Sequence, residues 1–108
     1  MPGKRGKPEP EERKEEALRP SCFLGYHRDK LAVYLVSRKA YRIAETQFRR
    51  AIWLNPYEPA FKQHLAVCLY KDGRYREARK WITEALEQQS DNPENRKILK
   101  LIEQEIKD

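Results

Sequence analysis

The chain has 108 residues, of which 37% are charged and 39% hydrophobic, and its formal net charge at neutral pH is +6. A chain of this length allows one small domain, which buries roughly 60 to 65% of its surface. The longest apolar run, residues 31 to 36, is too short to cross a bilayer. No apolar segment typical of a secretory signal peptide is found. We therefore expect a cytoplasmic protein without a membrane partner.

Residues 1 to 20 differ in composition from the rest of the chain. They hold four of the seven prolines, with six basic and five acidic side chains, and their apolar pair is Ala17 and Leu18. Such a segment cannot bury enough apolar surface to offset the loss of chain entropy. The sequence therefore predicts a disordered N-terminal tail. Its nearly balanced charge argues against a dedicated nucleic-acid arm.

Two helices are predicted after this tail. Ser21 is a candidate N-cap for a first helix that begins at Cys22 and runs to about Ser37. A second helix is expected over residues 40–54, where Asn55-Pro56 ends it because the residue before a proline disfavours helical geometry.

A second pair of helices is predicted over residues 59–90. Pro59 fits the first turn of a helix, where a missing N–H costs nothing, and apolar residues then recur at helical spacing up to Leu69. Gly73 follows at a position that suits the left-handed conformation of a helix C-terminus. The same apolar spacing resumes at Tyr75, so a second amphipathic helix must fold back on the first.

A fifth helix is predicted at the C-terminal end. Asp91 or Asn92 is the candidate cap. An apolar stripe marks the inner face of the helix, consisting of Ile98, Leu99, Ile102 and Ile106. The intervening residues are polar, which is typical of a terminal helix with one buried and one solvated face.

The two helical pairs are copies of one another at a constant offset along the chain. The matching residues of the first copy are Leu31, Ala32, Val33, Leu35, Tyr41, Arg42, Ala44 and Ala51, and those of the second are Leu65, Ala66, Val67, Leu69, Tyr75, Arg76, Ala78 and Ala85. We expect most of these positions to be buried in both copies. The offset corresponds to the period of tetratricopeptide repeats, about 34 residues.

The chain resembles the tetratricopeptide repeat family at these positions. The first copy also has Phe48 and Pro56 at the family's aromatic and closing proline positions, and the second has Gly73 at its turn position. The departures from the family pattern are Arg28 and Lys62 in place of Trp, Lys39 in place of the turn Gly, and Ser90 in place of the closing Pro. The resemblance implies an all-α fold of five helices, in which antiparallel helix hairpins stack as a short right-handed superhelix. The expected divisions within residues 21–108 are repeats at 25–58 and 59–92 and a capping helix at 93–108.

The histidines and cysteines form no recognisable catalytic or metal-binding pattern. His27 and His64 lack a Cys, Asp or Glu at a spacing that forms a triad or a metal site. Cys22 and Cys68 form no zinc or redox motif, and Cys68 is expected to be a small, partly buried residue. We therefore expect no enzyme, no metal and no cofactor.

The resemblance places the function on a surface. In the family, the first helix of each pair lines a concave groove that holds a partner's peptide or helix. The positions that carry over to this role are Tyr26, Asp29, Val33, Val36 and Ser37 in the first repeat and Ala60, Gln63, Val67, Tyr70 and Lys71 in the second. The alternative interpretation is that some of them pack against a neighbouring helix.

One binding mode known in the family is disfavoured by two of these residues. Chaperone-binding members clamp a terminal carboxylate with a Lys and an Asn one turn apart on the first helix. Here the corresponding positions hold Asp29 and Val33. An acidic residue would repel the carboxylate.

Two further surfaces suggest alternative functions. Trp53 and Leu101 lie off the predicted core stripes and could form a second interface, which would make the chain a self-associating assembly protein. Basic residues crowd the second and fourth helices, where they either attract nucleic acid or an acidic protein or are merely solvated. Aromatic residues that could stack on bases are missing there apart from Trp53, so a nucleic-acid accessory role is the weakest alternative. The sequence thus favours an adaptor that binds a protein or peptide.

Overall fold

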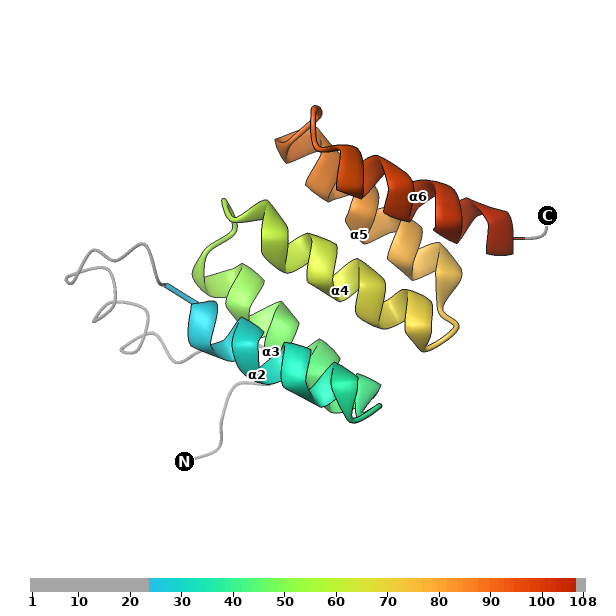
Figure 1. Ribbon diagram of the computed structural model, residues 1–108. Coiled ribbons are helices and arrows are strands. Elements are labelled where there is room, and N and C mark those ends of the chain that lie inside the picture. The colour runs from blue at the N-terminus through green and yellow to red at the C-terminus, as the bar shows by residue number, and fades with distance from the viewer. Residues whose placement is uncertain (1–23, 107–108) are drawn as a thin grey trace. The chain divides into compact units, whose positions relative to one another are not determined.

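The computed structural model describes residues 24–106, which form five α-helices and no strand (Figure 1). The expected disordered tail, together with Ser21 and Cys22, lies outside the described residues. The helices are α2 (Tyr26–Ser37), α3 (Tyr41–Leu54), α4 (Pro59–Lys71), α5 (Tyr75–Gln88) and α6 (Pro93–Glu105). The all-α prediction is confirmed. None of these helices combines the length and apolar character needed to span a membrane.

The chain divides into two compact units between Pro56 and Tyr57. In the first unit, α2 and α3 form an antiparallel hairpin (Figure 1). In the second unit, α4 and α5 form another hairpin, and α6 packs on α5 and contacts α4. Each unit therefore has the helix pairing predicted for one repeat, with one additional helix at the C-terminal end.

The two hairpin turns have the same hydrogen-bond pattern. After α4, the N–H of Gly73 donates to the carbonyl of Tyr70 at 3.1 Å, and that of Arg74 donates to Leu69 at 2.9 Å. This pair of bonds defines a Schellman motif, which satisfies carbonyls at the helix C-terminus. Gly73 adopts the required left-handed conformation with φ 83°, as the sequence predicts.

The first turn adopts the same motif without a glycine. The N–H of Lys39 donates to Val36 at 2.9 Å, and that of Ala40 donates to Leu35 at 2.9 Å. Lys39 therefore has to be left-handed, and its φ is 64°. A non-glycine residue in this region is strained because its Cβ crowds the backbone. The tertiary structure thus imposes on Lys39 a conformation that its own side chain disfavours.

The start of the first helix differs from the sequence prediction. Leu24 and Gly25 form a turn, and α2 begins at Tyr26 instead of at Cys22. Gly25 is left-handed with φ 84° at the N-cap position, a conformation that interrupts a right-handed helix. Further along the chain, the side-chain amide of Asn55 donates to the carbonyl of Leu24 at 3.5 Å, so this turn lies beside the end of α3.

Small residues form the centre of both hairpins. Ala32 and Ala44 are fully buried in the first unit, as are Ala66 and Ala78 in the second. Because alanine lacks a bulky side chain, the helix axes can approach closely at these points. The large buried side chains are Phe48, Leu54, Phe61, Leu65, Leu69, Ile82 and Ile102. They follow the helical periodicity that the sequence predicts.

The two copies are not equally buried, contrary to the expectation for Leu31. Leu65 is fully buried, whereas Leu31, its counterpart in the first repeat, is 47% exposed. Leu35 is likewise only half-buried, whereas its counterpart Leu69 is buried. Sequence identity between repeats fixes the helical register of a residue, but its burial depends on what packs against that face.

The helix α6 begins with an asparagine cap. Asn92 Oδ1 accepts hydrogen bonds from the N–H groups of Glu94 at 2.9 Å and Asn95 at 3.1 Å, and Pro93 occupies the first turn. Ile102 is buried as predicted. Ile106 lies just beyond the helix end. Asn95 is also buried, which the apolar stripe of this helix does not predict because an amide side chain is expected to face solvent.

Candidate partner-binding surfaces

Four of the predicted partner-binding residues of the first unit lie along one side of α2. Tyr26, Val33, Val36 and Ser37 recur at spacings that place them on one face of the helix. Val33 is 46% exposed, and Val36 is half-buried. This face therefore presents β-branched apolar side chains to solvent. The Ser37 hydroxyl donates to the backbone carbonyl of Tyr34, which keeps it close to its own helix.

Asp29 lies on the same side of α2 but is not presented to solvent. It is only 6% exposed. The sequence predicts that it lines a groove and repels a partner's carboxylate. A buried carboxylate has little direct access to a partner, so the exposed Val33 and the half-buried Val36 are the accessible centre of the α2 stripe.

The corresponding residues of the second unit lie along one side of α4. Gln63, Val67 and Tyr70 are half-buried, and Lys71 is exposed at the last turn. The ring of Tyr70 packs edge-to-face on that of Tyr75, with centroids 5.6 Å apart and an interplanar angle of 60°. This contact orients Tyr70 from the start of α5. Ala60, also expected on this side, is half-buried.

Gln63 combines burial with an unsatisfied donor. Its side-chain amide nitrogen is buried and has no hydrogen-bond partner. A buried polar group without a partner costs free energy, so this amide nitrogen lowers the stability of the second unit. Together, Gln63, Val67 and Tyr70 form a mixed polar and apolar stripe along α4.

The two residues suggested as a second interface differ in accessibility. Leu101 is 44% exposed on α6, which fits its position off the main apolar stripe. Trp53 is half-buried and is not the exposed side chain that the sequence predicts. Tyr57, which is 85% exposed after α3, was not among the predicted surface residues, nor were the exposed Tyr34 and Ile43. A lone exposed aromatic or aliphatic residue has no periodic signal in sequence.

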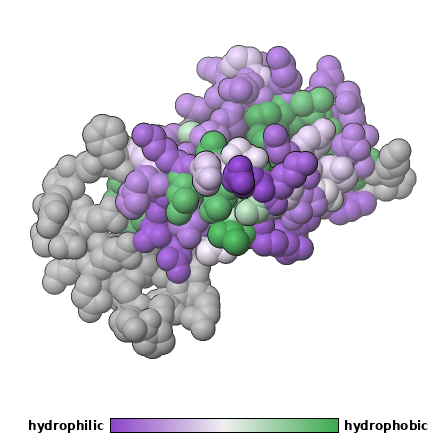
Figure 2. Space-filling model, turned by 60° about the horizontal axis from the view of Figure 1, so that its bottom comes forward, coloured by the Kyte–Doolittle hydropathy of each residue, from purple (hydrophilic) through white to green (hydrophobic). Residues whose placement is uncertain are grey.

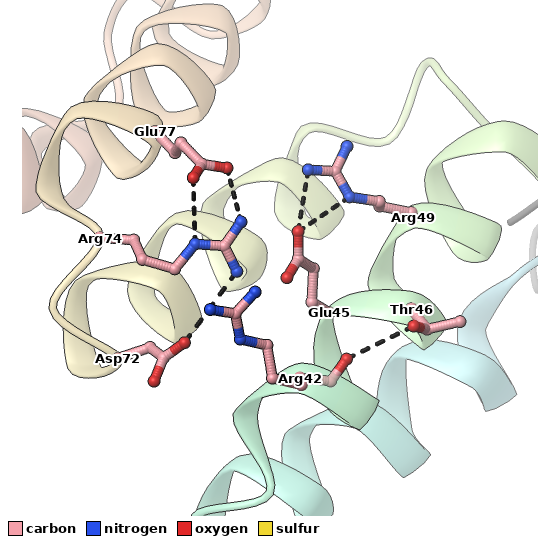
Figure 3. A network of polar contacts seen from close by, with 7 residues as sticks. All are labelled: Arg42, Glu45, Thr46, Arg49, Asp72, Arg74 and Glu77. Carbon is pink, nitrogen blue, oxygen red and sulfur yellow. Dashed lines mark hydrogen bonds and ion pairs between the residues drawn. The ribbon is translucent and has the colours of Figure 1, made fainter.

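Ion pairs neutralise part of the basic surface. Arg49 Nη2 lies 2.9 Å from Glu45 Oε2 on α3, and Arg74 Nη2 lies 2.7 Å from Glu77 Oε1 at the start of α5 (Figure 3). Arg74 Nη1 also approaches Asp72 Oδ2 at 4.0 Å. Hydrophilic residues cover most of the face in Figure 2, and hydrophobic ones gather in patches among them.

The net charge is unevenly distributed along the chain. Residues 24–56 hold seven Lys and Arg against two Asp and Glu, whereas residues 57–108 hold ten of each. The excess positive charge of the described chain therefore belongs to the first unit. A charge count over the whole domain shows the surplus but does not locate it.

Three of the histidines and cysteines considered above lie among the described residues: His27, His64 and Cys68. His27 is exposed on α2, and His64 is half-buried on α4. Cys68 is a buried cysteine on α4. Within residues 24–106, no three His, Cys, Asp or Glu side chains converge to hold a metal. A pocket of about 400 Å³ lies beside the start of α5 and the end of α6, where the Arg74–Glu77 pair forms part of its wall.

Paired antiparallel helices that recur along the chain, with apolar stripes on the first helix of each pair, define a helical-repeat protein. The family model described as "Tetratricopeptide repeat" matches residues 35–102. The chain belongs to the tetratricopeptide repeat family, whose repeats generally mediate protein–protein interactions and are typically not catalytic. No curated protein matches the chain.

Proposed function

We propose that this chain is a cytoplasmic adaptor that holds a peptide or helix of a partner protein against the first helix of each repeat. The contact residues are Tyr26, Val33 and Val36 on α2 and Gln63, Val67, Tyr70 and Lys71 on α4. Asp29 belongs to the same side of α2 but is buried beneath the contact surface. No catalytic step and no cofactor are part of this proposal.

The observation that carries the proposal is the accessibility of Val33 and Val36 on α2 and of Val67 on α4. Val33 and Val67 occupy equivalent positions in the two repeats, and neither is fully buried. Apolar side chains that a fold leaves open at repeated positions contribute binding free energy when a partner covers them, at about 25 cal/mol per Å².

A selection from a random peptide library tests the proposal without a candidate partner in hand. Peptides that bind the full chain are recovered, and their dissociation constants are measured by calorimetry for the wild type and for the Val33→Asp, Tyr70→Ala double variant. We expect the double variant to bind at least about tenfold more weakly, because it places a charge in the α2 stripe and removes an aromatic anchor from α4.

The matched control is the double variant Leu101→Asp, Tyr57→Ala. It makes the same kind of chemical change at exposed residues outside the two stripes. Circular dichroism confirms that all three proteins are folded. Equal loss of affinity in both double variants, or no loss in either, would refute the proposed site.

Self-association is the second candidate function, and the exposure of Leu101 and Tyr57 favours it. In that case sedimentation would show a mass that rises with protein concentration, and Leu101→Asp would restore the monomer. An accessory role on nucleic acid would instead give an affinity that falls steeply with salt.

A further inference from the structure

The solvent-facing side of α2 carries a surface that is distinct from the stripe of Val33 and Val36. Its members recur at the spacing of a helical turn and are all exposed: His27, Lys30, Leu31, Tyr34 and, directly after the helix, Arg38. Leu31 is 47% and Tyr34 58% exposed. We call these five residues the outer face of α2.

The same register positions are covered in the second repeat. The counterparts of His27, Leu31 and Tyr34 are Phe61, Leu65 and Cys68, and all three are buried. This register is therefore one at which the second repeat buries its side chains. In the same unit as α2, Ile43 of α3 is also left exposed. The outer face thus has the register and apolar content of a helix-packing surface, and none of residues 24–106 covers it.

The charged residues of the outer face indicate which kind of partner would bind there. Lys30 and Arg38 flank Tyr34, four residues before and after it, and are exposed. The carboxylates of residues 24–56 are elsewhere: Asp29 is buried on the other side of α2, and Glu45 pairs with Arg49 at 2.9 Å. The outer face is therefore free of acidic side chains and lies in the unit that holds the excess positive charge.

We propose that the outer face of α2 binds an acidic amphipathic helix of a partner protein. Apolar side chains of that helix cover Leu31 and Tyr34, and its carboxylates pair with Lys30 and Arg38. A nucleic acid satisfies the two cations but leaves Leu31 and Tyr34 without apolar contacts, and a second copy of this chain that packs its own outer face here brings the same cations against one another. An acidic helix satisfies both the apolar and the charged residues.

The test uses the full chain and a fluorescent synthetic peptide of about 18 residues, long enough for several helical turns. Leucines occupy one face of the peptide at helical spacing, and glutamates occupy the other positions. We expect fluorescence anisotropy to show saturable binding. The double variant Leu31→Glu, Tyr34→Glu should weaken it at least about tenfold, because two repelling charges replace two apolar contacts.

Three controls make the result specific. The variant Tyr57→Glu, Leu101→Glu carries the same charge change on exposed residues of the second unit, and its affinity should stay within about twofold of the wild type. A peptide of the same composition with its leucines scattered around the helix should bind at least about tenfold more weakly. The variant Lys30→Glu, Arg38→Glu changes only exposed charged residues and should also weaken binding, which keeps the test decisive if the first variant fails to fold.

Equal binding of the wild type and the outer-face variants would overturn the proposal. Equal binding of the scattered peptide, or tighter binding of a single-stranded oligonucleotide, would show that charge alone is recognised and would overturn it too. Self-association of the wild type that Leu31→Glu, Tyr34→Glu abolishes, without peptide binding, would assign the face to a second copy. None of these outcomes bears on Val33 and Tyr70, so the proposed function stands or fails separately.

Discussion

Lys39 and Gly73 occupy the same position in two equivalent turns, but the left-handed conformation is less favourable in free energy for Lys39. Both residues are left-handed, with φ 64° and 83°, and both close a Schellman motif. Glycine adopts this conformation without a steric penalty, whereas lysine does not. The first hairpin therefore carries local strain that the second avoids.

Replacing Lys39 by Gly should stabilise the protein by about 1 kcal/mol, because it relieves the crowding of Cβ at positive φ. Thermal unfolding should then shift upward by roughly 4 to 8 °C. Lys39→Ala is the control, since it removes the charged side chain but keeps Cβ, and it should leave the melting temperature nearly unchanged. An equal gain in both variants would mean that the Lys39 side chain, and not its backbone conformation, is unfavourable.

The reverse change at Gly73 should destabilise the protein by about 1 kcal/mol. A Cβ built at this residue meets no atom within 4 Å, so the cost of Gly73→Ala is conformational and does not come from a clash with a neighbouring residue. Urea unfolding measures this difference. An unchanged midpoint would contradict the left-handed turn that the structure shows.

The sequence predicts where most of the helices begin and end more closely than it predicts which of their residues are buried. Gly73, Pro59 and the Asn92 cap have a local cause, and the structure confirms each of them. The start of α2 differs from the predicted one because the left-handed Gly25 interrupts the helix, and residue periodicity does not reveal this break. The burial of Asn95 and the exposure of Leu31 depend on packing between helices, which periodicity alone does not specify.

The cap of α6 gives a prediction for a single element. Asn92→Ala removes the acceptor for the N–H groups of Glu94 and Asn95 and should cost about 1 kcal/mol of stability. Asn92→Asp keeps a capping oxygen and should cost much less. If both variants unfold at the same denaturant concentration as the wild type, the cap does not stabilise α6.

The ion pair on α3 should contribute little despite its short distance. Arg49 and Glu45 are one helical turn apart, and the Arg49 side chain is 41% exposed. Surface pairs of this type contribute about 0.5 kcal/mol, which salt screens. A double-mutant cycle with Glu45→Gln and Arg49→Gln isolates their coupling from the other contacts of both residues. A coupling of several times this size that persists at high salt would contradict this view.

The family resemblance predicts the candidate site residue by residue. The structure leaves Val33, Val36, Val67 and Tyr70 open to solvent to different degrees, whereas it buries Asp29. The residue types that favour binding could be recognised in sequence. Their accessibility could not, because it depends on which faces of the helices other side chains cover.

The concentration of positive charge in the first unit has a consequence for association. Residues 24–56 carry the excess cationic charge, while the charges of residues 57–108 balance. Association with an acidic partner should therefore slow as salt increases, since electrostatic steering is screened beyond about 10 Å at roughly 0.1 M ionic strength. Stopped-flow measurement of the association rate at several salt concentrations tests this, and a rate that does not depend on salt would contradict it.

The adaptor proposal is tested most directly by methyl NMR of the full chain with selectively labelled valine, leucine and isoleucine, titrated with a peptide from the library selection. The account predicts that the methyl signals of Val33, Val36 and Val67 shift with a common dissociation constant while that of Leu101 does not. Shifts confined to Leu101, or to Leu31 and Ile43, with the three valines unchanged, would contradict it.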